Sequence, residues 1–142
     1  MIMPYLNFDG DCEEAFRLYQ RAFGGQEPVF ARYGEGPDDP AHPMDEAQKT
    51  KIMHGYVALT ETEGISGADA LLPVEKGLAP SIHVNCSGIG QGQQAFRVLA
   101  EEGAVVDQLQ PDPFSRGNEL RGSVRDKYGF TWVISAQSGG SF

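Results

Sequence analysis

Short segments in which apolar and polar side chains alternate recur along the chain, and this period of two predicts β-strands. The segments 5–8 and 82–86 have that pattern, with every second side chain apolar. Each is followed by a stretch in which apolar residues recur at i, i+3 and i+4, over about 11–23 and 91–102, as in a helix that buries one side. Each half of the chain therefore begins with a strand and continues into an amphipathic helix.

Alternation returns after each helix and predicts three further strands in each half. In order along the chain, these strands cover 28–33, 51–60, 65–72, 105–109, 120–125 and 130–136. The segment 34–48 interrupts the pattern, because it is polar and rich in glycine and proline. We expect a flexible loop there, with a gate over a binding site as the alternative.

The order of elements is the same in both halves, which indicates an internal repeat. The triplet Ala-Phe-Arg occurs at 15–17 and again at 95–97, within the two predicted helices. The repeat places module one at 1–72, a connector at 73–79 and module two at 80–142. Because a single βαβββ module is too small to close a core, we predict one α+β domain made of two such modules.

Composition narrows the classes of partner. The chain of 142 residues has 20 acidic and 11 basic side chains, a formal net charge of −9, without a cluster of lysine and arginine. We therefore expect neither nucleic acid nor an anionic membrane as a partner. The sequence has no apolar run long enough to span a bilayer and no basic start of a secretory signal, so we expect a cytoplasmic protein. Cys12 and Cys86 are interpreted as small buried hydrophobes, not as a disulfide framework.

Three motifs carry a resemblance to a known family. The opening reads Pro-Tyr-Leu-Asn-Phe-x-Gly-x-Cys-x-x-Ala-Phe-x-x-Tyr from residue 4 and reaches Phe-Gly-Gly at 23–25. With Lys-Ile-Met-His-Gly at 51–55 and Asp-Lys-Tyr-Gly-Phe-x-Trp at 126–132, it resembles the PhnB-like branch of the vicinal oxygen chelate superfamily, which includes glyoxalase I, bleomycin and fosfomycin resistance proteins and extradiol dioxygenases. The likeness covers nearly the whole chain except 34–48. It implies paired βαβββ modules whose curved mixed sheets enclose a cavity, a small-molecule ligand and a homodimer.

The resemblance also implies a divalent metal in that cavity, with ligands from the first and last strands of the modules. Carried onto this chain, the first-strand positions fall at Asn7 and His83, and the last-strand positions fall at Asp69 and within 131–134. Asparagine is a weak ligand, and 131–134 contains no Asp or Glu. We therefore expect no metal centre of the family type; if a divalent metal binds, His83 and Asp69 are the ligands expected.

Two histidines are candidates for the cavity on the pattern of their own strands. His83 lies on the polar side of a strand whose other side is apolar, where it is either a ligand or general base, or a hydrogen-bonded residue that lines the cavity. In the strand around His54, the pattern places Ile52, His54, Tyr56 and Ala58 on one face. We expect His54 either to line a ligand pocket with Tyr56, or to be buried and bonded to the backbone or to Tyr56.

Aromatic and basic residues of the last strands add two hypotheses. Trp132 is a candidate for stacking on a ligand ring, with a place in the core as the alternative. Arg121, Ser123 and Arg125 share one face of their strand, which suits an anionic ligand, with a charged strand edge as the alternative.

The leading functional hypothesis is a small-molecule-binding protein of the glyoxalase/bleomycin-resistance type. Its candidate cavity residues are Asn7, His54, Tyr56, Asp69, His83 and Trp132. The alternatives are a metal-dependent lyase or dioxygenase with a degenerate metal site, and a protein that sequesters a drug without a reaction. A methyltransferase is not indicated, because no glycine-rich cofactor loop follows a first parallel strand. The sequence leaves open whether the chain is an enzyme and what its substrate is, since one fold hosts many chemistries.

Overall fold

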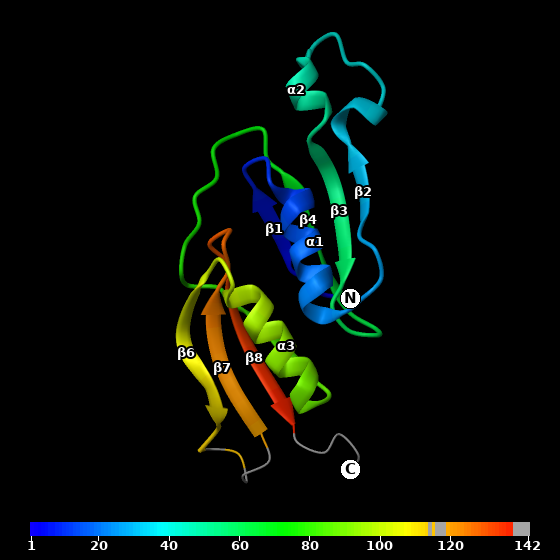
Figure 1. Ribbon diagram of the computed structural model, residues 1–142. Helices are drawn as coiled ribbons and strands as arrows, with labels where there is room; N and C mark the ends of the chain where they lie inside the picture. Colours follow the sequence, from blue (N-terminus) through cyan, green and yellow to red (C-terminus); the bar gives the residue numbers. More distant parts are fainter. Residues whose placement is uncertain (114, 116–118, 138–142) are drawn as a thin grey trace. The chain divides into compact units, whose positions relative to one another are not determined.

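Each half of the sequence folds into a four-stranded sheet with a helix against one of its faces (Figure 1). The computed structural model describes residues 1–113, 115 and 119–137. By its contacts the chain divides into a first unit, 1–20 with 25–75, and a second unit, 21–24 with 76–142. The last turn of the first helix is thus grouped with the second unit.

The first unit contains four strands, two helices and a 3₁₀ turn. In chain order these are β1 (Tyr5–Phe8), α1 (Cys12–Phe23), β2 (Val29–Arg32), η1 (Tyr33–Glu35), α2 (Glu46–Lys49), β3 (Ile52–Ala58) and β4 (Gly64–Asp69). Strand order in the sheet is β1-β4-β3-β2, with β1 parallel to β4 and the other pairs antiparallel.

The second unit repeats this arrangement. Its elements are β5 (Ile82–Cys86), α3 (Ile89–Ala100), β6 (Ala104–Pro111), β7 (Glu119–Arg125) and β8 (Thr131–Gln137). Strand order is β5-β8-β7-β6, again with one parallel pair, β5 and β8. Over the described residues both sheets are mixed and neither closes into a barrel, so the α+β class and the two βαβββ modules expected from the repeat are confirmed.

The phenylalanine of the repeated triplet explains how each helix contacts its sheet. A Cβ added to Gly67 of β4 would lie 2.9 Å from the ring of Phe16, and one added to Gly122 of β7 would lie 2.9 Å from the ring of Phe96. Both rings therefore rest against strand glycines, which leave space that any other residue would fill. Phe16 is fully buried, and Phe96 is 8% exposed.

Two segments differ from the sequence prediction. Helix α3 begins at Ile89, two residues before the expected 91. Residue 92 lies in the first turns of this helix and has to be a glycine, because an added Cβ would lie 2.5 Å from the Cβ of Ala136. The expected flexible loop at 34–48 contains part of η1 and most of α2. A capping box starts α2, in which Asp45 accepts the backbone N–H of Gln48 and the Gln48 side chain accepts that of Asp45. Among the described residues, no helix is long and apolar enough to cross a membrane.

Candidate functional site

The side of the second sheet opposite α3, called here the second open face, carries most of the polar candidates. Gly92 of α3 approaches Ile134 and Ala136 of β8, so the alternate residues of β8, Val133 and Ser135, lie on the other side of the sheet. The strand register then places two rows of side chains on that side. One row is Asn85, Ser135, Arg121 and Gln110; the next is His83, Val133, Ser123 and Asp107.

A chain of hydrogen bonds links three side chains of this face. His83 Nε2 lies 2.9 Å from Ser135 Oγ, and the Ser135 hydroxyl donates to Asn85 Oδ1 at 3.2 Å. Since the one hydroxyl proton of Ser135 is directed to Asn85, its oxygen accepts from His83. In the neutral ring this arrangement corresponds to the tautomer with the proton on Nε2 and the lone pair on Nδ1, while the amide NH₂ of Asn85 points away from Ser135.

Exposure separates the roles of these three residues. His83 and Asn85 are exposed on β5, whereas Ser135 is fully buried beneath them. The hydroxyl of Ser135 is therefore out of reach of a ligand, and its role is to fix the orientation of His83. Sequence reasoning missed Ser135, although its position two residues after Val133 would have placed it on the same face.

The basic residues of β7 lie on the same face, as the sequence predicted. Arg121, Ser123 and Arg125 alternate with the helix-facing Gly122 and with Val124, which is fully buried. Ser123 donates to the Asp107 carboxylate at 3.2 Å. Arg121 is exposed and Arg125 is partly exposed.

The corresponding side of the first sheet, called here the first open face, carries three further candidates. Asn7 of β1 and His54 of β3 are exposed, and Tyr56 is partly exposed. The rings of Tyr5 and His54 lie 6.1 Å apart, so these two aromatic side chains share this face. The structure thus brings Asn7, His54 and Tyr56 to one side of the first sheet, and His83 to the open side of the second.

One neighbour of His54 was assigned to the wrong face. Ile52 is 1% exposed on the helix-covered side, whereas His54 is exposed on the other. The register between β2 and β3 shifts here, since Ala31 pairs with His54 and Arg32 pairs with Ile52. Such an irregularity breaks the strict alternation that the sequence argument used.

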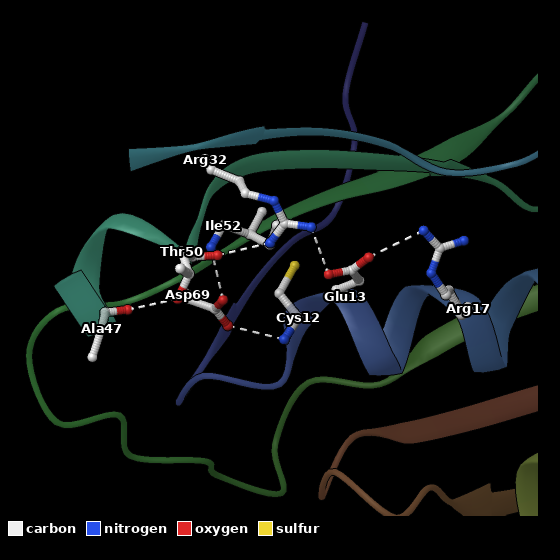
Figure 2. A network of polar contacts seen from close by, with 8 residues as sticks. All are labelled: Cys12, Glu13, Arg17, Arg32, Ala47, Thr50, Ile52 and Asp69. Atoms are coloured by element: carbon white, nitrogen blue, oxygen red, sulfur yellow. Dashed lines mark hydrogen bonds and ion pairs between the residues drawn. The ribbon is translucent and has the colours of Figure 1, made fainter. Parts of the chain in front are cut away.

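Asp69 lies on the helix-covered face of the first sheet and not on the open face. Its side chain is 2% exposed, and its two carboxylate oxygens accept the backbone N–H groups of Cys12 and Ile52, each at 2.9 Å (Figure 2). Cys12 is the first residue of α1 and Ile52 the first of β3. The carboxylate therefore ties the start of the helix to the start of a strand, in the way that an acidic group stabilises a helix N-terminus.

Figure 2 also shows a second network, formed by more exposed side chains near the start of α1. Arg32 donates to the Thr50 carbonyl at 2.7 Å and to Glu13 at 2.8 Å, and Glu13 also accepts from Arg17 at 3.1 Å. Hydrogen bonds from Arg32 and then from Arg17 lower the pKa of the Glu13 carboxyl. Glu13 thus stays ionised to lower pH than an isolated glutamate, and these contacts hold the segment after α2 against α1.

Trp132 also lies on the helix-covered side. Its side chain is fully buried, its ring lies 5.4 Å from that of Phe23, and its indole N–H donates to Asp126 at 2.9 Å. The same carboxylate accepts the backbone N–H groups of Tyr128 and Phe130 in the turn before β8. The indole therefore anchors a turn inside the second unit, and a ligand on the open face does not meet it.

The donor set does not fit the metal centre that the resemblance implied. Both oxygens of Asp69 already accept backbone N–H groups, and Nε2 of His83 is directed to Ser135. Within 1–113, 115 and 119–137, no group of three or more His, Cys, Asp or Glu residues gathers as metal ligands.

The two cysteines are free and buried. Burial, followed by the nearby charge of Asp69, raises the pKa of the Cys12 thiol to about 12. Burial also raises the pKa of the Cys86 thiol. Both thiols are therefore protonated at neutral pH and unsuited to act as nucleophiles.

Comparisons with known proteins agree with the motifs. A family model described as 3-demethylubiquinone-9 3-methyltransferase matches residues 1–135. Protein YjdN of Escherichia coli (strain K12) is 28% identical over 149 residues, which cover 94% of this chain and 93% of that protein.

Solved structures extend the likeness to the fold. Protein PA1353 from Pseudomonas aeruginosa has a TM-score of 0.81 at 28% identity, covering 97% of this chain and 98% of its own. A putative 3-demethylubiquinone-9 3-methyltransferase, PhnB protein, from Bacillus cereus has a TM-score of 0.74 at 27% identity, covering 95% and 98%. A glyoxalase/bleomycin resistance protein from Albidiferax ferrireducens T118 shares the fold alone, with a TM-score of 0.64 at 9% identity and coverage of 96% and 100%.

The resemblance drawn from the sequence motifs is confirmed by these matches. The chain belongs to the family described as 3-demethylubiquinone-9 3-methyltransferase, and it is similar to a PhnB protein that carries the same description.

Proposed function

We propose that this protein binds a small organic molecule on the open faces of its sheets. On the second open face His83 is the residue that faces a ligand, and on the first open face, taken by itself, Asn7, His54 and Tyr56 are the candidates. The observation that carries the proposal is the hydrogen-bonded chain from His83 through Ser135 to Asn85, because it orients polar groups on an exposed strand. A small-molecule site needs a few polar groups of fixed geometry on a rigid scaffold.

Substitution of His83 tests the proposal. A collection of aromatic and anionic compounds is screened by ligand-observed NMR against the whole chain, His83→Ala and His42→Ala. His42 is a matched control, since it is exposed in the segment before α2, where it pairs with Asp39 at 2.9 Å. We expect His83→Ala to bind the ligands of the second open face more weakly, with its melting temperature nearly unchanged, and His42→Ala to bind them as the wild type does. A melting temperature lowered as much as by a core deletion would instead make His83 structural.

We further propose that the protein acts in the cytoplasm as a homodimer. The family resemblance supports a dimer, and size-exclusion chromatography with light scattering measures it. A single peak at twice the chain mass of 15.4 kDa is expected. A monomer at tens of micromolar contradicts the dimer and leaves the binding proposal in place.

A further inference from the structure

Two arginines of the second open face lack the partner that the other arginines have. Six arginines are described, and four of them form ion pairs with glutamates: Arg17, Arg21, Arg32 and Arg97. Arg121 and Arg125 have no such pair within the part of the chain that the structure describes. In a chain of net charge −9, which has more carboxylates than cations, this exception is confined to one strand, β7.

Arg125 adds an observation of its own. Its Nε atom is buried and has no hydrogen-bond acceptor among the described residues. A buried charged donor without an acceptor costs free energy, so proteins seldom keep one without a use for the group. Among the residues that the structure describes, neither guanidinium group of this face is paired with a carboxylate.

The row that contains Arg121 holds a second free donor. Asn85, Ser135 and Arg121 are neighbours across β5, β8 and β7. Because the Asn85 amide oxygen accepts from Ser135, its NH₂ group remains available on the exposed side. Adjacent strands lie about 4.8 Å apart, so Asn85 and Arg121 flank Ser135 at roughly equal spacing and a long arginine side chain can reach across.

We propose that the second open face binds the anionic group of a small organic acid above Ser135, between Arg121 and the amide of Asn85. This inference rests on the proposed function and names its ligand class. A guanidinium fork matches the two oxygens of a carboxylate or phosphoryl group. Arg125 lies four residues along β7, about 13 Å away at the usual strand rise, so it adds positive charge to the face without touching the same oxygens.

His83 extends the recognition to the atom beside the anionic group. It occupies the next row of the same face, and its Nδ1 lone pair is directed away from Ser135. That nitrogen accepts a hydrogen bond and does not attract a second anionic oxygen. The ligand class is therefore an acid with a hydroxyl or other hydrogen-bond donor next to its anionic group.

Four probes separate the parts of this inference in titrations of the ¹⁵N-labelled whole chain at constant ionic strength. Sodium mandelate has a carboxylate and a neighbouring hydroxyl, phenylacetate lacks the hydroxyl, mandelamide lacks the charge, and inorganic phosphate tests a phosphoryl source. We expect mandelate to shift the amide signals of residues 85, 121 and 135 and to bind more tightly than phenylacetate, with mandelamide weakest. Binding of phosphate at the same signals assigns a phosphoryl group, and binding of mandelate alone assigns a carboxylate.

Variants identify the residues. Arg121→Ala should weaken mandelate binding at least tenfold, and Arg121→Lys should weaken it less, because a lysine keeps the charge and loses the fork. Arg97→Ala is the matched control, an exposed arginine of the same unit that pairs with Glu101, and it should bind as the wild type does. His83→Ala should abolish the preference for mandelate over phenylacetate.

Two results overturn the inference. If mandelamide binds the face as tightly as mandelate, or if Arg121→Ala leaves mandelate binding unchanged with a normal melting temperature, the anionic group is not what the site recognises. In either case binding on the open face persists and the proposed function stands. If neither the probes nor the screened compounds shift any signal of either open face, the proposed function itself fails.

Discussion

The carboxylate of Asp69 accepts the backbone N–H of Cys12, 57 residues earlier in the chain, at 2.9 Å. The bond closes the first unit, because β4 carries the acid at its end while α1 begins at the cysteine. Asp69, which the family resemblance implied as a metal ligand, therefore has a structural role in this chain.

Replacing Asp69 with alanine should therefore lower stability. Two buried N–H groups, those of Cys12 and Ile52, would lose their acceptor, at a combined cost of about 3 kcal/mol in the free energy of unfolding. Urea unfolding followed by circular dichroism measures this cost. Asp9→Ala, at an exposed position after β1, is the control and should stay within about 0.5 kcal/mol of wild type. An Asp69→Ala protein as stable as wild type would return Asp69 to the list of ligand candidates.

Two glycines of α3 should respond to alanine with opposite signs. At Gly92 an added methyl group meets the Cβ of Ala136 at 2.5 Å, so Gly92→Ala should destabilise the protein by about 1–3 kcal/mol. At Gly90 nothing lies within 4 Å of such a methyl group, and Gly90→Ala should stabilise the helix by about 0.5 kcal/mol. The same unfolding experiment measures both variants. Equal effects at the two positions would contradict the close approach of α3 to β8.

The thiols should be unreactive in the folded protein. Because the pKa of Cys12 is raised to about 12, a folded chain at pH 8 contains almost no Cys12 thiolate, and the raised pKa of Cys86 acts in the same direction. Ellman's reagent should therefore react slowly with native protein and rapidly, at two thiols per chain, in urea. Reaction of a native thiol within seconds at pH 8 would show that its pKa is not raised.

Trp132 should report on folding rather than on the ligand. The only tryptophan in the chain is fully buried and hydrogen-bonded to Asp126, so native emission should be blue-shifted and should move to longer wavelength on unfolding. Trp132→Phe removes that bond and should cost about 1–3 kcal/mol. Ligands that bind the open face should leave the emission wavelength unchanged. A ligand-induced shift in Arg121→Ala as well as wild type would place binding near the indole instead.

The bond between His83 and Ser135 fixes a tautomer that NMR can observe. At a pH where His83 is neutral, its ring should carry the proton on Nε2 in the wild type. Ser135→Ala removes the acceptor, and the ring should then populate both tautomers. Long-range ¹H–¹⁵N spectra of the imidazoles distinguish the two forms. A neutral His83 protonated on Nδ1 in the wild type contradicts the direction of the hydrogen-bond chain.

Periodicity alone was enough to predict the eight strands, the two long helices and the repeat, because most strands alternate apolar and polar residues; it did not predict η1 and α2. It also placed His83 on the open side, and Arg121 with Arg125 on a shared face. It failed at Ile52, since a register shift cannot be seen in the alternation of side chains.

Long-range pairing explains the other differences. The acceptor role of Asp69 depends on where β4 ends relative to α1, which no local pattern encodes. Trp132, Ile134 and Ala136 alternate along β8 and therefore lie on the same face of the strand. The burial of Trp132 could have been predicted from the sequence once this face was known to be covered by the helix. Ser135 is polar and fully buried, and only the register reveals its neighbours.

The matching sheets also bear on how the two halves diverged. The strand pairings show which residues occupy equivalent places in the two sheets. Asn7 pairs with Ala68 as His83 pairs with Val133, so Asn7 and His83 correspond. Tyr56 pairs with Ser66 as Arg125 pairs with Thr131, so Tyr56 and Arg125 correspond. If both halves descend from one duplicated segment, the two halves had identical residues at each of these equivalent positions directly after the duplication. The two helices have kept the same phenylalanine, at Phe16 and Phe96, while the uncovered sides differ and the pair Arg121 and Arg125 occurs in the second half alone. On that condition one half acquired the arginines while both halves kept the same order of strands.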